Sequence, residues 1–440
     1  MHELAHEFTN RKVSPWGGIK FFHKTYLKTG LQSYLRGLNL PFPGSNRGYD
    51  PVDLIEGFMT SVVLGSRRLE HSGMLRTDEV IKEIFGWEKG MASASTFSRF
   101  FQKFSVERND EVFPEVMKYW FEQVHLPRMT VDIDSTVITR YGNQEEAKKG
   151  YNPQKQGRVS HHPLFAFCDD LKMVINTWMR SGNSNSSSNI ESFLEELFYI
   201  VPKKRIGLIR ADSGFYSDGV FNQLEQKRVG YIVRAKMTSR LEDQLVKIKH
   251  WHANNKVREG ACYAEIKYKA KGWEKARRII VVRTEKQGEV DVNDYIFEEE
   301  ANRVKYDYKA YVTNTISSAV QIHSLYNGRA DCENRIKELK YDYSIDGFSL
   351  QEFGAMEAAF RMIMIAYNVM SLFRQKVMTS SQAKRLQTIK FQCIAIGSYL
   401  VKSGRNTKLK LAAEGKRRHF LEHFFSNLEV LDSPFRFSNA

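Results

Sequence analysis

The sequence predicts an α/β protein with a mixed β-sheet, flanked by mainly helical regions towards both ends of the chain. Three observations support this expectation. Apolar residues at helical spacing dominate residues 1–125, alternating β-branched segments mark residues 126–235, and helical spacing returns beyond residue 350. In the α/β segment, the predicted elements follow in the order hairpin, strand, helix, strand, helix and strand. That order is typical of a sheet with helices on both faces.

The composition predicts a polyanionic partner. The chain has 440 residues, with 66 Lys and Arg against 51 Asp and Glu, which gives a formal net charge of +15. Such an excess of basic residues favours nucleic acid. An uninterrupted apolar run of about 18 residues, as a membrane span needs, does not occur. We therefore expect no membrane contact and a buried helix at Ala358–Phe373, which Arg361 and Asn368 interrupt.

The start of the sequence and its cysteines argue against two other classes of protein. An apolar stretch of signal-peptide type is missing, so we expect a cytoplasmic protein. His2-Glu3-Leu4-Ala5-His6 matches the zinc-protease pattern, but a motif that begins at residue 2 has no preceding chain to enclose a metal. The cysteines stand far apart without Cys-x-x-Cys spacing, which predicts free thiols. They are Cys168, Cys262, Cys332 and Cys393.

A helix with one aromatic face is predicted in the N-terminal region. Its phenylalanines, spaced i, i+3, i+4 and i+7, are Phe97, Phe100, Phe101 and Phe104. Ser93 or Ser95 can cap this helix, and Arg99 and Lys103 leave from its outer side. A preceding helix, Asp78–Phe85, is compatible with a helix-turn-helix, although such helix pairs are more often plain packing. DNA contact by this region stays open.

Two aspartates are predicted on one face of a strand. Thr130–Ile138 is β-branched and alternating, so Asp132 and Asp134 point to one side of this strand and Ile133 to the other. Carboxylates on a strand of buried type are costly unless they are paired or bound to metal. A site is therefore the favoured interpretation.

A third aspartate ends a later strand. Asp212 follows the segment Lys204–Ala211 and precedes a glycine turn and a helix that Ser217 or Asp218 can cap. Open α/β sheets place their chemistry at the carboxyl ends of strands. The alternative is an aspartate that only orders the turn.

The segment Ser324–Lys340 is predicted as one helix with a mixed acidic and basic face. At about 100° per residue, four side chains project from one side. They are Tyr326, Arg329, Glu333 and Lys340, and Glu333 is the one carboxylate among them. The alternative is a solvated helix with ion pairs three and four residues apart.

Residues 236–316 are predicted to be rich in β-strands, with basic and aromatic residues interleaved. The expected strands are Cys262–Lys269, Ala276–Thr284, Tyr295–Glu299 and Tyr308–Asn314. Helix is expected again over residues 350–440, with a basic last part for which we favour phosphate contact over a solvated face. Its cations are Lys402, Arg405, Lys408, Lys410, Lys416, Arg417 and Arg418.

The set Asp134, Asp212 and Glu333 resembles the Asp-Asp-Glu transposases of bacterial insertion sequences, whose catalytic core is of the ribonuclease H type. The helix matches each position of the Tyr-(2)-Arg-(3)-Glu-(6)-Lys signature of one large branch. Further segments look like motifs of that subgroup, and they are Asp134–Thr136, Gly150–Pro153 with Arg158, His162-Pro163, Arg180–Asn183 and Asp212–Tyr216. The Asp-x-Thr match favours Asp134 as the first acid without excluding Asp132.

The resemblance implies DNA cleavage at the ends of an element and strand transfer into target DNA, by two Mg²⁺ or Mn²⁺ ions. Asp134, Asp212 and Glu333 would hold the ions, since hard cations prefer carboxylate oxygens. The residues implied to bind DNA are Tyr326, Arg329, Lys340, Arg158 and Arg180, with Asp132 and His162 as further site candidates. A nuclease without strand transfer and a non-catalytic DNA-binding protein remain alternatives.

The same resemblance implies the partners and the division of the chain. The partners are double-stranded DNA, as inverted-repeat ends and target, and a second copy of the chain on paired ends, at the bacterial nucleoid. Five regions are expected. They are a helical DNA-binding region (1–125), the first part of the core (126–235), a β-rich insertion (236–316), the last part of the core (317–375) and a basic helical region (376–440).

Overall fold

The computed structural model describes residues 4–45, 47–185, 188–254, 259–286, 297–379 and 384–437. Contacts divide the chain into two compact units. Unit 1 comprises Met1–His125, Arg140–Ala147 and Ile336–Phe437, and unit 2 comprises Leu126–Thr139 and Lys148–Arg335. The boundary between Arg335 and Ile336 divides the predicted region 317–375 between the two units. His2 and Glu3 of the protease-like pattern lie outside the described residues.

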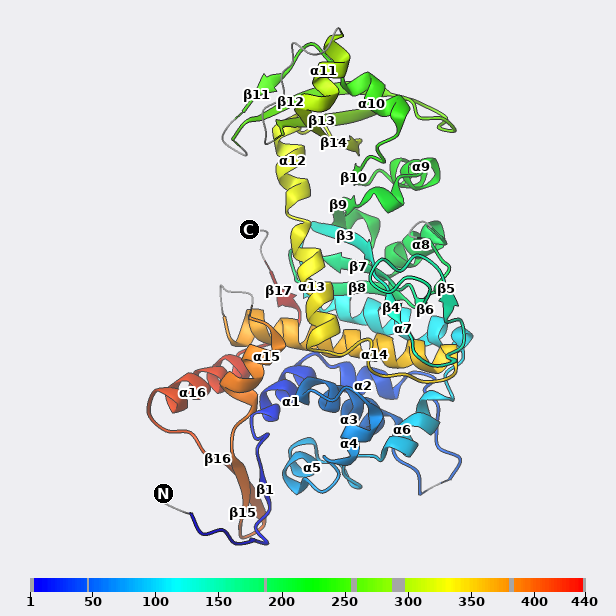
Figure 1. The fold of residues 1–440 in the computed structure, drawn as a ribbon. Coiled ribbons are helices and arrows are strands. Elements are labelled where there is room, and N and C mark those ends of the chain that lie inside the picture. Colours follow the sequence, from blue (N-terminus) through cyan, green and yellow to red (C-terminus); the bar gives the residue numbers. More distant parts are fainter. Residues whose placement is uncertain are drawn as a thin grey trace. The chain divides into compact units, whose positions relative to one another are not determined.

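Unit 1 is mainly helical (Figure 1). Its helices are α1 (Ile19–Lys28), α2 (Leu31–Arg36), α3 (Pro51–Leu64), α4 (Leu69–Gly73), α5 (Glu79–Phe85), α6 (Ala94–Phe101), α7 (Val106–Glu122), α14 (Phe353–Leu372), α15 (Leu386–Ile389) and α16 (Gly415–Glu429). Its strands are β1 (Val13–Ser14), β2 (Val124–His125), β15 (Ser398–Ser403), β16 (Asn406–Leu411) and β17 (Phe435–Arg436).

Helix α14 forms the centre of unit 1. It packs against α3 and α7. Among the described residues, the helical stretch Phe353–Val377 is long and apolar enough to cross a membrane, and its apolar window is wholly buried inside the structure. The core helix of a compact unit has the same composition, so the expectation of a buried helix at this place is confirmed.

The predicted N-terminal helices α5 and α6 are confirmed with their caps. The Asp78 carboxylate accepts hydrogen bonds from the backbone N–H groups at the start of α5. The Ser93 hydroxyl accepts one from Thr96 N–H at the start of α6. Phe97, Phe100 and Phe101 are buried, as the aromatic spacing predicted.

A buried histidine gives unit 1 a pH-dependent stability. The His23 ring lies 4.3 Å from the Phe85 ring between centroids. Burial lowers the pKa of His23 to about 4, and the positive charge of Lys20 acts in the same direction. The unfolded chain takes up this proton near pH 6.5, whereas the folded chain resists it down to about pH 4. The free energy of unfolding should therefore fall as the pH falls through that window.

Urea unfolding at pH 7 and pH 5 tests this expectation. The wild type should lose about 1–2 kcal/mol more than His23→Phe, in which nothing titrates at this position. His125→Gln, at an exposed strand position, serves as the control and should lose as much as the wild type. An equal loss in His23→Phe and the wild type would contradict the assignment.

Unit 2 is built on a nine-stranded sheet in the order β11-β12-β13-β14-β10-β9-β3-β7-β8. The strands are β3 (Met129–Ser135), β7 (Leu164–Cys168), β8 (Met173–Trp178), β9 (Ile206–Ala211), β10 (Gly230–Arg234), β11 (His252–Ala253), β12 (Ala261–Tyr268), β13 (Arg277–Glu285) and β14 (Tyr306–Thr313). The pairs β3–β9 and β9–β10 are parallel, whereas the other pairs in this sheet are antiparallel. The predicted mixed α/β sheet is confirmed, and its ribonuclease H type stays a prediction.

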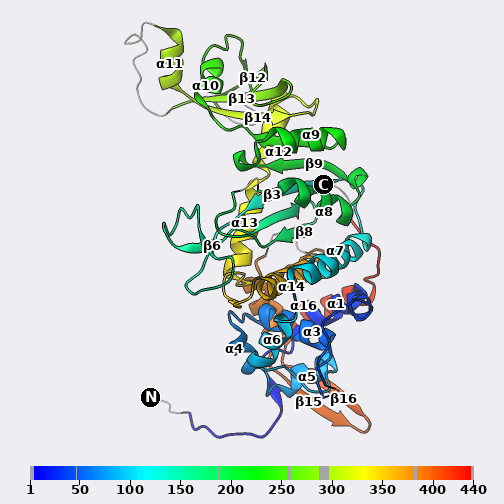
Figure 2. The same cartoon turned by 90° about the vertical axis from the view of Figure 1, so that its right-hand side faces the viewer.

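Helices and a small sheet complete unit 2 (Figure 2). The helices are α8 (Ile190–Ile200), α9 (Asp218–Gln226), α10 (Ser239–Leu245), α11 (Glu298–Lys305), α12 (Ala319–Asn327) and the first half of α13 (Ala330–Tyr341). The small sheet contains β4 (Ile138–Thr139), β5 (Lys148–Lys149) and β6 (Val159–His161). Strand β14 pairs with β10, so the strands predicted as an insertion continue the core sheet.

Two predictions of secondary structure outside the segment Ser324–Lys340 are wrong. Tyr295–Glu299 was expected as a strand, but residues 295–296 lie outside the described part and Glu298 begins helix α11. Three glutamates in its first turn and two cations in its last turn suit the helix dipole. Residues 398–411, expected to be helical, form the hairpin β15–β16. Gly404 turns it with a φ of 60°, and Leu409 and Leu411 alternate with lysines at the period of a strand.

Candidate active site

Asp134 lies near the end of β3, and Asp212 directly follows its parallel neighbour β9. In the register of β3 and β9, Asp132 lies opposite Arg210 and Ile133 opposite Ala211. Asp134 and Asp212 are the next residues after this last pair, within one residue of the end of β3 and of β9. Neighbouring strands lie about 4.8 Å apart. The negative charge of Asp212 acts on Asp134 across this gap, so the structure brings the first two predicted acids together.

Asp134 is a nearly buried carboxylate with 8% of its surface exposed. Its Oδ1 accepts a hydrogen bond from Ser135 N–H at 2.9 Å and pairs with Arg329 Nη2 at 2.9 Å. Its Oδ2 lies 3.8 Å from the thiol sulfur of Cys332. Burial raises the pKa of Asp134 to about 6; Asp212 acts in the same direction and Arg329 opposes them.

Arg329 is held at this carboxylate by the sheet itself. Its guanidinium is 7% exposed and also donates to the carbonyl oxygen of Ile133 at 3.2 Å. Burial alone would lower the pKa of Arg329, but the charge of Asp134 outweighs it and the pKa is raised. The predicted DNA-binding arginine is therefore a permanent cation paired with the first predicted acid.

Asp132, the alternative first acid, has a different environment. It is wholly buried, and Arg210 donates to both of its carboxylate oxygens, from Nε at 2.6 Å and from Nη2 at 2.8 Å. A two-pronged arginine contact of this kind satisfies a carboxylate. The geometry thus gives Asp132 a structural ion pair and favours Asp134, at the strand end, as the site residue.

The ion pair of Asp132 extends into a network that the sequence did not indicate. Asp169, in the turn between β7 and β8, accepts hydrogen bonds from Arg210 Nη2 at 2.9 Å, from Lys172 Nζ at 2.9 Å and from Arg335. Burial alone would raise the pKa of Asp169, but Arg335 and Lys172 lower it. Because Arg335 belongs to α13, the network fastens the start of this helix to the sheet.

The helix expected over Ser324–Lys340 is interrupted, which corrects the prediction of one continuous face (Figure 1). Helix α12 ends at Asn327 and α13 begins at Ala330. Gly328 is a weak helix former. It also lies against the sheet, since a Cβ atom built on Gly328 would stand 2.7 Å from Arg210 Nη1. The break lets Arg329 reach Asp134.

Tyr326 and Glu333 lie on either side of this break. The Tyr326 ring packs 4.6 Å from the ring of Tyr311 on the sheet, and burial raises its pKa. Glu333 is exposed on α13 and makes no hydrogen bond or ion pair with any residue that the structure describes. Within the described ranges, no three Asp, Glu, His or Cys side chains form a group that could hold a metal. Glu333 is thus not grouped with the two aspartates.

The other predicted DNA-binding residues differ in exposure. Lys340 lies in the part of α13 that belongs to unit 1, and burial lowers its pKa. Arg158 is exposed. Arg180 is buried and donates to the carbonyl oxygens of His162, Asn185 and Ser188.

Burial lowers the pKa of Arg180 to about 10. His162 is buried as well, and its Nδ1 lies 2.7 Å from the carbonyl oxygen of Ser184. Arg180 and His162 thus hold the loop before α8 in place, and only Arg158 of these three is on the surface.

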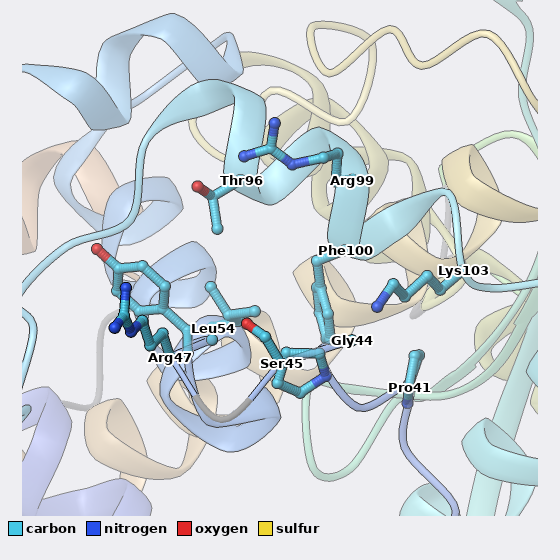
Figure 3. Close-up of a pocket in the computed structure, with 12 residues that line it drawn as sticks. Pro41, Gly44, Ser45, Arg47, Leu54, Thr96, Arg99, Phe100 and Lys103 are labelled. Atoms are coloured by element: carbon cyan, nitrogen blue, oxygen red, sulfur yellow. The ribbon is translucent and has the colours of Figure 1, made fainter.

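A basic pocket lies in unit 1, between α6 and residues of the segment that precedes α3 (Figure 3). Its volume is about 380 Å³, and its lining contains three cations and no acid. The cations are Arg47, Arg99 and Lys103. Lys103 donates to the carbonyl oxygen of Phe42 at 2.7 Å. Arg47 and Arg99 make no ion pair with any described residue. Arg99 is exposed on α6, as predicted, and Lys103 is exposed two residues after the end of this helix.

The fold and these acids define an α/β protein with carboxylates at the ends of parallel strands. The chain belongs to the DDE transposase family, because the family model described as Transposase DDE domain group 1 matches residues 2–433. The expectation of a DDE-type transposase is thereby confirmed, whereas the bacterial insertion-sequence branch stays a prediction.

The chain is similar to a chain of the piggyBac transposase synaptic complex with hairpin DNA, determined by cryo-electron microscopy. The identity is 12% and the TM-score 0.45, over 96% of this chain and 82% of the other. No curated protein matches the sequence.

Proposed function

We propose that this transposase cuts DNA at the ends of its own element and joins those ends to target DNA. The observation that supports this best is the pairing of β3 with β9, in which Ile133 lies opposite Ala211, the residues directly before Asp134 and Asp212. Asp134, Asp212 and Glu333 are the proposed catalytic residues. In a cell we expect the protein to act in the cytoplasm at the nucleoid, as two copies on paired ends.

The donor set fits a hard divalent ion such as Mg²⁺ or Mn²⁺, since it consists of carboxylate oxygens without His or Cys ligands. Two such ions, when bound, activate the attacking oxygen and stabilise the leaving one. Asp134 and Asp212 would hold them. Glu333, which has no partner among the described residues, is available to complete the second site.

Arg329 links the acids to the proposed DNA contacts. It now pairs with the Asp134 oxygen that a metal would take. The guanidinium of Arg329 would contact a phosphate group next to the acids, since its N–H donors match phosphate oxygens in pairs. Tyr326, Lys340 and Arg158 are proposed as further DNA contacts, and the basic pocket of Figure 3 as a contact in unit 1.

Cleavage and joining can be measured in one assay. Purified protein is incubated with a duplex that carries the inverted repeats flanking its gene and with a target plasmid. We expect cut ends and joined products with Mg²⁺ or Mn²⁺, and neither product in excess chelator. Equal cleavage in chelator would contradict the proposal. Cut ends without joined products would favour a nuclease, and binding without cleavage would favour a DNA-binding protein.

A further inference from the structure

The hairpin β15–β16 projects from unit 1. In Figures 1 and 2 it reaches beyond the neighbouring helices of this unit. Six cross-strand pairs join its strands, from Ser398 opposite Leu411 to Ser403 opposite Asn406. Strand β1 pairs only at its base, with Tyr399 and Ser398. The outer part is therefore a two-stranded ribbon with no third strand.

The register gives the ribbon two different faces. Residues opposite each other on paired strands share a face, and neighbours in sequence alternate. One face, here termed the basic ribbon face, consists of Tyr399, Val401, Ser403, Asn406, Lys408 and Lys410. The other face, here termed the leucine face, consists of Ser398, Leu400, Lys402, Thr407, Leu409 and Leu411.

Helix α5 lies on the side of the leucine face. Ser14 of β1 is opposite Ser398, which belongs to the leucine face, and the Ser14 hydroxyl donates to Asp78 at the start of α5. The basic ribbon face is therefore turned away from α5. Arg11 adds a cation to that face, because its guanidinium lies 3.6 Å from the centre of the Tyr399 ring.

The charge of the ribbon is not compensated within the described residues. The side chains of its four cations are exposed and make no ion pair or hydrogen bond with any residue that the structure describes. They are Lys402, Arg405, Lys408 and Lys410. The sequence contains no Asp or Glu between Glu357 and Glu414. A projecting element of this kind repels a basic surface and attracts a polyanion.

The dimensions of the ribbon fit one groove of duplex DNA. Six residues per strand extend over about 20 Å, and two strands lie about 4.8 Å apart. The major groove, about 12 Å wide, admits a two-stranded ribbon, whereas the minor groove, about 6 Å wide, is too narrow for one with its side chains.

We propose that the hairpin β15–β16 inserts into the major groove of duplex DNA with the basic ribbon face towards the base edges. Ser403 and Asn406 would meet base edges, and Lys408 and Lys410 the phosphates beside the groove. The inference rests on the proposed action on DNA and assigns one element to its recognition.

Methylation of DNA by dimethyl sulfate tests the insertion, because guanine N7 lies in the major groove and adenine N3 in the minor groove. The probe is a duplex that carries one end of the element. The variant K408T/K410T removes two charges with a residue that suits strands. The control K203T/K204T removes two exposed charges from unit 2.

The wild type and K203T/K204T should shield guanine N7 within the bound region. K408T/K410T should lose this shielding, and the slope of log affinity against log salt should become shallower by about two relative to the control. Unchanged guanine shielding in K408T/K410T, or wild-type shielding of adenine N3 alone, would overturn the insertion while leaving the proposed function intact. A wild type that binds no duplex would contradict both.

Discussion

Asp134→Asn and Asp212→Asn should each reduce DNA cleavage by about 10³-fold or more, since a lost metal ligand removes several kcal/mol of transition-state stabilisation. Glu333→Gln should have an effect of the same order. Each change keeps the shape of the side chain and removes a charge. DNA binding should therefore be retained, or slightly strengthened because a negative charge disappears near the phosphates.

Asp331→Asn provides the matched control for these variants. Asp331 is exposed on α13, two residues before Glu333. Its ion pair with Arg335 is long, at 3.8 Å, and its ion pair with Lys172 is exposed to solvent. Cleavage by this variant should stay within about threefold of the wild type, as expected for the loss of a weak surface pair. Asp134→Asn protein that is folded, binds DNA and still cleaves at the wild-type rate would show that the first acid is wrongly assigned.

Arg210→Met should be the most destabilising single change in the network beneath the site. It leaves the wholly buried Asp132 without its cation. Removing one partner of a buried ion pair costs about 3–5 kcal/mol, because the other charge remains in a medium of low polarity. Urea unfolding measures this loss, and circular dichroism in native buffer reports whether the variant folds.

Two further variants make this prediction specific. Lys172→Met removes an exposed partner of Asp169 and should cost at most about 1 kcal/mol. In Asp132→Leu/Arg210→Met both charges are gone, and much of the lost stability should return, because apolar residues of similar size can replace a buried ion pair. An Arg210→Met variant as stable as Lys172→Met would contradict the buried network.

The alternation of side chains along a strand was sufficient to predict that Asp132 and Asp134 share one face. It was also sufficient to place Asp212 at the end of β9. The role of Arg210 was not predicted, because a cross-strand pair is visible only once the neighbouring strands and their register are known. The sequence did contain a signal for this pair. Arg210 precedes Asp212 by two residues, just as Asp132 precedes Asp134, so each of the two strands carries two charged residues on one face.

The predictions that failed have different physical causes. The helical wheel placed Arg329 and Glu333 on one face, but Gly328 packs on Arg210 and ends α12 there. The basic segment 398–411 was expected to be helical because of the helices around it. Its own alternation and Gly404 make it a hairpin.

The central claim is that Asp134 and Asp212 hold the metal ions of a DNA-cutting site. Electron paramagnetic resonance of Mn²⁺ on the protein bound to an uncleaved element end tests it most directly, because bound ions are counted without turnover. We predict two ions per site in the wild type and in Asp331→Asn, and fewer in Asp134→Asn and Asp212→Asn at the same free Mn²⁺. Two ions per site in Asp134→Asn, with unchanged affinity, would contradict the account.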